Sequence, residues 1–95
     1  MTILRIEHGV RDYESWKAAF DSDPVGRAAG GVRHYRVARP TDAPNHVVVD
    51  LEFDTVGEAD AFGQKLRALW EGPAAGLGLE DARMRILDVV ETRDL

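Results

Sequence analysis

The sequence has no cysteine, no excess of basic residues and no long apolar run, and each absence excludes a class of protein. Without cysteine, the 95-residue chain cannot form disulfides, thiolate zinc sites, iron–sulfur clusters or a cysteine nucleophile. Its 12 basic and 17 acidic residues give a net charge of −5, the wrong sign for a protein that binds phosphates, so we expect no nucleic-acid partner. Arg5 and Glu7 interrupt the apolar positions of the first ten residues, so we expect no signal peptide, no membrane span and a cytoplasmic location.

The residues that are present are typical of one small globular domain. Hydrophobic residues make up 44% of the chain and charged residues 31%, which is ordinary for a folded protein. We expect a single domain over residues 1–95. A chain of this length buries only about two thirds of its unfolded surface, so its stability is expected to depend partly on a partner.

Hydrophobic periodicity divides the chain into six elements. Asp12 is placed to cap a helix whose stripe carries Tyr13, Trp16 and Phe20, and Thr55 begins a capping box for a second helix. The predicted elements are strand 2–10, helix 12–22, strand 32–39, strand 46–53, helix 55–71 and strand 82–92, with one further helical turn over 24–29. This order, with right-handed crossovers, predicts an α+β, ferredoxin-like βαββαβ fold. Its four-stranded antiparallel sheet carries both helices on one face.

The second face of this sheet has no helix to cover it. The first, second and fourth strands carry apolar residues in both alternating phases, as Ile3 and Leu4 or Ile86 and Leu87 illustrate, so neither face is expected to be simply solvated. A face of about 400 Å² is near the largest apolar patch that a soluble monomer tolerates. We therefore expect a second copy to cover it, which makes the protein a homodimer.

The run V-x-D-Y-x-x-W-K-x-x-F from Val10 to Phe20, placed after a strand that contains His8, carries a family resemblance. Together with VVVDLEF at 47–53 and the Gly/Pro segment after Trp70, it resembles the small dimeric α/β-barrel proteins related to antibiotic-biosynthesis monooxygenases and polyketide cyclases. The resemblance implies a dimeric α/β barrel of two sheets, with a ligand pocket in each subunit between the sheet and the helices.

The same resemblance bears on cofactors and site residues. The oxygenase members need no metal or flavin, because the substrate supplies the electrons, and their sites use Asn, Trp, Tyr, Arg and His side chains. Trp70, Tyr35 and the histidines are comparable here, whereas the single asparagine, Asn45, falls in a predicted turn. Haem-degrading members rely on a helical histidine, which neither predicted helix contains, so we expect no cofactor.

The three histidines are the candidate catalytic bases: His8, His34 and His46. Two or three of them could converge with Asp50 on a metal ion, but nothing in their spacing demands it, and no metal site is predicted. Each also has a plain structural interpretation as a hydrogen-bonded or exposed side chain. The candidate ligand-pocket residues are Tyr35, Asp50, Phe62, Trp70 and Arg85, with the Gly-rich segment 72–78 as a flexible rim. Arg85 is either an inward anion ligand or a surface ion-pairing residue.

Two functions remain open. We favour a non-catalytic homodimer that binds a small apolar or aromatic ligand or accompanies another protein. The alternative is a cofactor-independent monooxygenase or cyclase that acts on an aromatic or polyketide-like molecule, with a histidine as its base. A deep apolar cavity that holds a histidine and an arginine would favour catalysis, and a cavity filled by its own side chains would favour a structural role.

Overall fold

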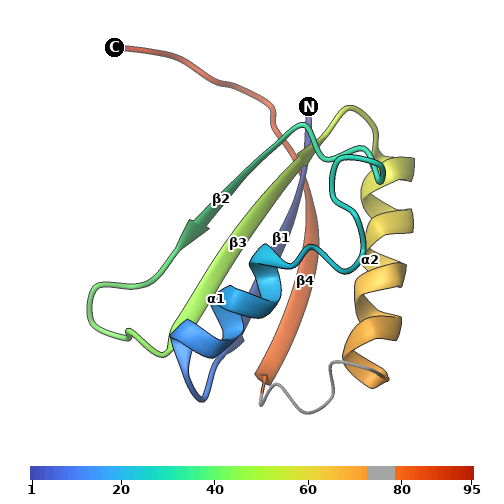
Figure 1. Cartoon of the computed structure of the whole chain (residues 1–95). Helices are drawn as coiled ribbons and strands as arrows, with labels where there is room; N and C mark the ends of the chain where they lie inside the picture. Colours follow the sequence, from blue (N-terminus) through green and yellow to red (C-terminus); the bar gives the residue numbers. More distant parts are fainter. Residues whose placement is uncertain (73–78) are drawn as a thin grey trace.

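The predicted order of elements and fold class are confirmed (Figure 1). The computed structural model describes residues 1–72 and 79–95. Its elements are β1 (Thr2–Gly9), α1 (Tyr13–Asp21), β2 (His34–Ala38), β3 (His46–Phe53), α2 (Val56–Glu71) and β4 (Glu80–Asp88). Within these described ranges, no helix is both long and apolar enough to span a bilayer.

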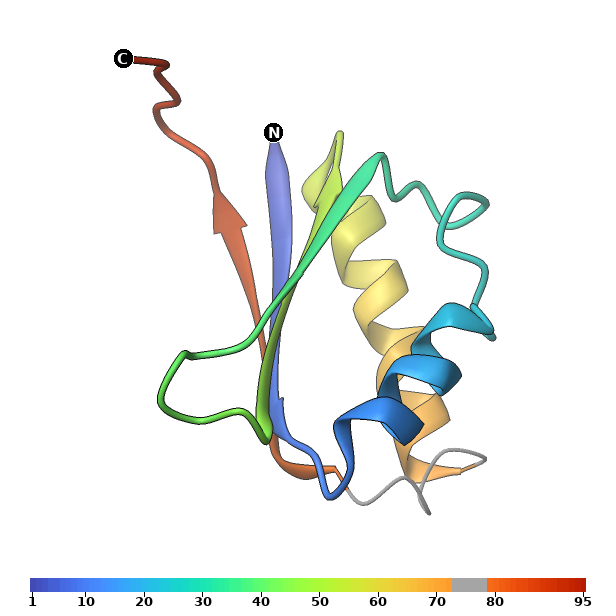
Figure 2. The ribbon, with the colours of Figure 1, turned by 60° about the vertical axis from the view of Figure 1, so that its left-hand side comes forward.

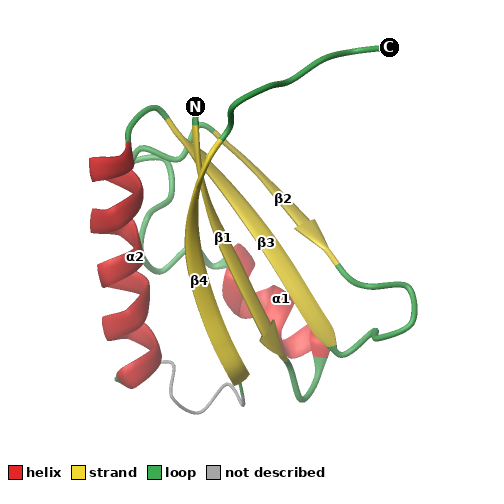
Figure 3. Ribbon diagram, turned by 180° about the vertical axis from the view of Figure 1, so that it is seen from behind, coloured by secondary structure: helices red, strands yellow, loops and turns green. Residues whose placement is uncertain are grey.

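The sheet has the strand order β2-β3-β1-β4, and each neighbouring pair is antiparallel. Both helices cover the same face of the sheet (Figure 2). Seen from behind, the strands lie in front and no described helix covers them (Figure 3). We call these the helix face and the open face.

The register of β1 decides which side chains lie on each face. Leu4 pairs with Leu51 of β3, and Ile6 pairs with Val49, so these four side chains share the helix face. With α1 and α2 they form the core, whose fully apolar members are Leu4, Ile6, Val10, Trp16, Val47, Val49, Leu51, Phe53, Ala59 and Phe62. The regular alternation of β1 and β3 therefore produces one apolar layer.

The two predicted helix caps are present. Asp12 accepts a hydrogen bond from the backbone N–H of Ser15 at 3.1 Å, and Thr55 Oγ1 accepts one from the N–H of Glu58 at 3.1 Å. These caps fix the start of each helix and hence the face that it presents. The buried side chains are Trp16 on α1 and Ala59 and Phe62 on α2.

The open face is more charged than the sequence led us to expect. Its middle row crosses all four strands as Arg36, Asp50, Arg5 and Arg85. Arg5 holds Asp50 through two bonds of 2.9 Å, and Arg36 lies 3.5 Å from the same carboxylate. These hydrogen bonds and charges lower the pKa of Asp50. Apolar residues such as Ile3 and Leu87 occupy the adjoining rows, so the face is mixed.

Three predicted segments differ from the structure. The fourth strand ends at Asp88 instead of residue 92, because the Val89 N–H bonds to the Met1 carbonyl and the chain then passes the end of β1 (Figure 1). The second strand is shorter than 32–39, and residues 24–31 form hydrogen-bonded turns without a helix. Most of the proposed Gly-rich rim, 73–78, lies outside the described residues.

Candidate functional site

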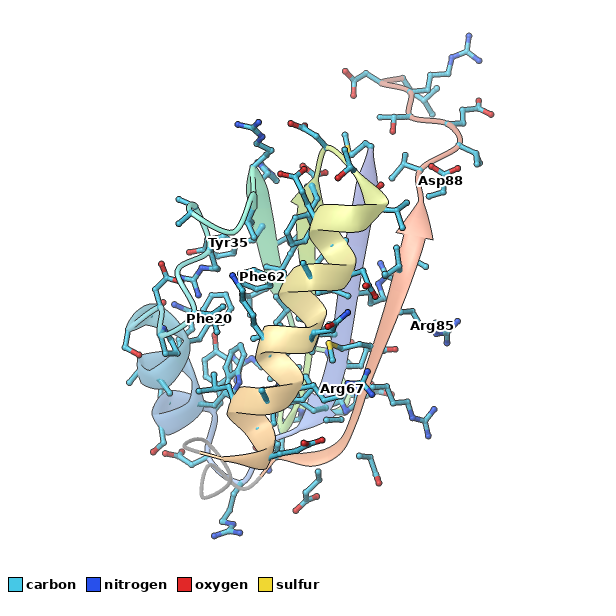
Figure 4. All side chains as sticks on the ribbon, turned by 90° about the vertical axis from the view of Figure 1, so that its right-hand side faces the viewer. Phe20, Tyr35, Phe62, Arg67, Arg85 and Asp88 are labelled. Atoms are coloured by element: carbon cyan, nitrogen blue, oxygen red, sulfur yellow. The ribbon has the colours of Figure 1, made fainter. Side chains whose placement is uncertain are left out.

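An apolar cavity of about 290 Å³ lies between the helix face of the sheet and the two helices. Figure 4 shows Phe20, Tyr35 and Phe62 on this side of the sheet, and Arg85 directed away from it. The described residues that line the cavity are Ile6, His8, Trp16, Ala19, Phe20, Ser22, Asp23, Pro24, Val25, Arg27, Val49, Leu51, Phe62, Leu66, Leu69, Trp70 and Leu79. Most of these side chains are aliphatic or aromatic. The cavity is thus suited to an apolar molecule.

Aromatic rings connect the two helices across the sheet. The ring of His8 lies edge-on to Trp16 of α1, with centroids 5.4 Å apart, and edge-on to Trp70 of α2 at 6.2 Å. Trp16 in turn stacks on Phe20 at 5.2 Å. These rings offer flat, polarisable surfaces to a ligand.

His8 is a buried imidazole with a defined tautomer. Its exposed fraction is 2%, and its Nδ1 lies 3.2 Å from the carbonyl oxygen of Gly9. Because a carbonyl oxygen only accepts hydrogen bonds, Nδ1 must carry the proton, and Nε2 of the neutral ring keeps its lone pair. Burial lowers the pKa of His8, since the charged form loses its hydration. The cavity therefore contains a neutral imidazole that can accept a proton or hydrogen bond.

Arg27 supplies a cation to the cavity wall. Its side chain is 16% exposed, and its Nη1 donates to the Phe20 carbonyl at 2.7 Å. The guanidinium lies over the Phe20 ring, 4.0 Å from its centroid, and 4.9 Å from that of Tyr35. A turn with positive φ at Asp23 (52°) and Gly26 (80°) positions it, and Asp23 Oδ1 accepts the Arg27 backbone N–H at 2.9 Å.

Our sequence reasoning missed Arg27. The available signal was the Asp-Pro-x-Gly turn at 23–26 immediately after the aromatic stripe, which brings the following side chain back against the end of the helix. That signal locates a turn but does not show which neighbours the arginine meets, because the contact with Tyr35 depends on how the following strand, β2, joins the sheet.

The structure separates the candidate pocket residues into three groups. Phe62 and Trp70 line the cavity, so their role in ligand binding stays a prediction. Tyr35 lies beside it, with its ring 5.3 Å from that of Phe20 and 44% of its surface exposed. Asp50 and Arg85 lie on the open face, so their placement in the pocket is wrong. Asp50 on β3 and Arg85 on β4 are both paired with Arg5 of β1, which lies on the open face. Side chains of paired residues lie on the same face, so Asp50 and Arg85 point away from the cavity.

The three histidines do not share a site. His8 faces the helices, whereas His34 and His46 are in phase with Asp50 on the open face. A metal site that joins them is therefore excluded by the sheet itself. Among residues 1–72 and 79–95, no group of three or more His, Asp or Glu side chains could hold a metal ion.

Comparison with known proteins shows the fold of the chain. No family model matches the sequence, and no curated protein matches it significantly. Solved structures match along the whole chain. The chain has the fold of these proteins. A candidate antibiotic biosynthesis monooxygenase from Deinococcus radiodurans is 15% identical, with a TM-score of 0.65, over 100% of this chain and 98% of that one.

Two further structures share the fold. One is a MhuD mutant with two manganese protoporphyrin IX molecules bound per active site, 13% identical, with a TM-score of 0.67 over 99% of both chains. The other is a dimeric ferredoxin-like protein from an uncultured marine organism, 11% identical, with a TM-score of 0.62 over 100% of both chains. The resemblance stated from the sequence is thus confirmed at the level of the fold.

Burial of His8 predicts a pH dependence of stability. The unfolded chain takes up a proton near the ordinary pKa of 6.5, whereas folded His8 resists protonation, so the free energy of unfolding should decrease as the pH falls through that value. His8→Phe should remove this part of the decrease. Urea unfolding between about pH 7.5 and about pH 5.5 measures it. His34→Gln, which changes an exposed side chain on the open face, should retain it; an unchanged profile for His8→Phe would contradict the assignment.

Proposed function

We propose that each chain binds one small, flat, apolar or aromatic molecule in this cavity and serves as a ligand-binding or accessory protein. The cavity itself is the observation that supports this function, since its walls are apolar and about 290 Å³ of it is not filled by side chains. That volume is at the low end of small-molecule pockets. It suits a bicyclic aromatic better than a porphyrin, and neither α1 nor α2 contains a histidine for a haem iron.

Filling the cavity tests this proposal. Ala19 lines the cavity, and Ala18, its exposed neighbour on α1, does not. Ala19→Phe should weaken the binding of naphthalene by about ten-fold or more, because the new ring occupies the ligand's space, whereas Ala18→Phe should have little effect. Quenching of the fluorescence of Trp16 and Trp70 measures the affinity. Equal affinities for both variants would show that the probe binds elsewhere, and no binding to the unmodified protein would refute the function.

We also propose that the single domain forms a homodimer through its open face. The face has no described helix to cover it, and it combines apolar side chains with charges of both signs, such as Arg85 and Glu52. A two-fold axis brings the same patch of each copy together, so arginines of one copy can meet carboxylates of its partner. That one of the structures with this fold is a dimeric ferredoxin-like protein supports a dimer.

Sedimentation at micromolar concentration tests the dimer. The unmodified protein should sediment at twice the 10.5 kDa mass of the chain. Leu87→Glu places a charge beside Ile3 on the open face and should shift the protein toward monomer. Ala68→Glu makes the same kind of change on an exposed position of α2 and should leave the dimer intact. A monomeric unmodified protein would refute the proposal.

A second candidate function, favoured by the state of His8, is cofactor-independent oxygenation or cyclisation. Nε2 of the neutral ring can take a proton from an acidic C–H or O–H of an aromatic ligand. The resulting anion can attack a carbonyl of the same molecule, or it can react with dioxygen. In the second case a methylene becomes a carbonyl, its two hydrogens leave in water, and the substrate supplies all the electrons.

Dioxygen uptake with anthrone as the probe separates catalysis from binding. His8→Phe keeps an aromatic ring beside Trp16 and Trp70, so the affinity for anthrone should be retained. Because the variant lacks the base, the rate of dioxygen uptake should fall by about a hundred-fold or more. An unmodified protein that binds anthrone without accelerating its oxidation would leave ligand binding as the function. Full activity in His8→Phe would remove His8 from the mechanism.

A further inference from the structure

Arg27 is an unusual residue for an apolar cavity wall. A largely buried charge is costly unless a counter-charge compensates it, and the only ion pair of Arg27 within the described residues is with Asp23. Nε lies 3.6 Å from Asp23 Oδ1, which is too long for a hydrogen bond, and the Asp23 side chain is 38% exposed. By contrast, Arg5 donates two hydrogen bonds of 2.9 Å to the Asp50 carboxylate. The charge of Arg27 is therefore only loosely compensated.

The guanidinium is nevertheless held in one orientation. Its Cζ lies 4.0 Å from the centroid of the Phe20 ring and 4.9 Å from that of the Tyr35 ring, and Nη1 donates a hydrogen bond to the Phe20 carbonyl. A guanidinium carries more N–H donors than this contact uses. A pre-oriented guanidinium matches a planar oxyanion and loses little entropy when it binds one.

We propose that Arg27 is the specificity-determining residue of the cavity and that the ligand is an aromatic molecule with an acidic oxygen, a carboxylate or an ionised phenol. This inference rests on the proposed function, because it names the chemical class of the ligand in the same cavity. The aromatic part of the ligand lies among the rings of the cavity, and its oxyanion binds the guanidinium. Asp23 is then a competing counter-ion, which lowers the affinity for an anion.

A plain structural role for Arg27 makes a different prediction. If Arg27 only fixed the 22–27 turn against Phe20, its loss would weaken the binding of charged and neutral ligands alike. A pair of probes that differ in charge but have the same ring system separates the two roles: 2-naphthoate and the neutral 2-naphthalenemethanol. Tryptophan fluorescence titration gives both affinities.

The unmodified protein should bind 2-naphthoate more tightly than 2-naphthalenemethanol. Arg27→Gln should lower the affinity for 2-naphthoate by about ten-fold to a hundred-fold, as expected for a lost charge-assisted hydrogen bond. The affinity for 2-naphthalenemethanol should change by less than about three-fold. Arg67→Gln removes an arginine from an exposed position of α2 and should alter neither affinity. A similar loss for both probes in Arg27→Gln would overturn the proposal and leave the proposed function in place.

Asp23→Asn provides a test of opposite sign. Asparagine keeps the oxygen that accepts the Arg27 N–H and tolerates the positive φ of this position, but it removes the competing charge. The affinity for 2-naphthoate should rise by about two-fold to five-fold, and that for 2-naphthalenemethanol should not change. An unchanged or weaker affinity for 2-naphthoate would contradict the role of Asp23 as a competitor. Failure of both probes to bind the unmodified protein would refute the proposed function and this inference together.

Discussion

The pairing of β1 with β3 is the constraint on which the rest of this structure depends. β1 is central, and its register places Leu4, Ile6 and His8 on the helix face, opposite Leu51, Val49 and Val47. Because side chains alternate along a strand, a slip of one residue would move all of them to the open face and bring Arg5 and Glu7 into the core. The same register that forms the core therefore places one imidazole under the helices and leaves the other two outside.

The cavity follows from how this layer is covered. Large rings from both helices, Trp16 and Trp70, pack against the ring of His8 in edge-on geometry. The site then combines a neutral base on β1 with a cation on the turn after α1, in largely apolar surroundings. A molecule that satisfies both groups would be aromatic and would carry an acidic proton or its conjugate anion. In the two functions that we propose, ligand binding and proton abstraction are related uses of one cavity.

Sequence reasoning succeeded where the relevant signal was local. The caps at Asp12 and Thr55, the alternation of β3 and the order of the elements each depend on residues close in the chain, and each was found. The sequence gives each strand two faces but does not say which one meets the helices. The faces of the three histidines therefore stayed open, and Asp50 was counted among the pocket candidates.

The remaining errors have physical causes of the same kind. β4 carries apolar residues in both phases, so Met84 and Leu87 did not show which phase faces the helices. Arg85 was therefore kept as a pocket candidate although it lies on the open face. The sequence does not show that β4 ends at Asp88, because this end is set by the start of β1, its neighbour in the sheet. Arg27 contacts Phe20 from the same segment and Tyr35 from β2, and only the fold brings these together.

If the space between the helix face and the two helices takes up a flat aromatic molecule, that molecule must lie against the core methyl groups. An isotope-filtered nuclear Overhauser experiment on the labelled protein with unlabelled naphthalene detects such contacts. We expect contacts from the naphthalene protons to the methyl groups of Ile6, Leu66 and Leu69, and none to Ile3 or Leu87. Contacts confined to the open-face methyls, or no contacts with any core methyl, would contradict binding in this space.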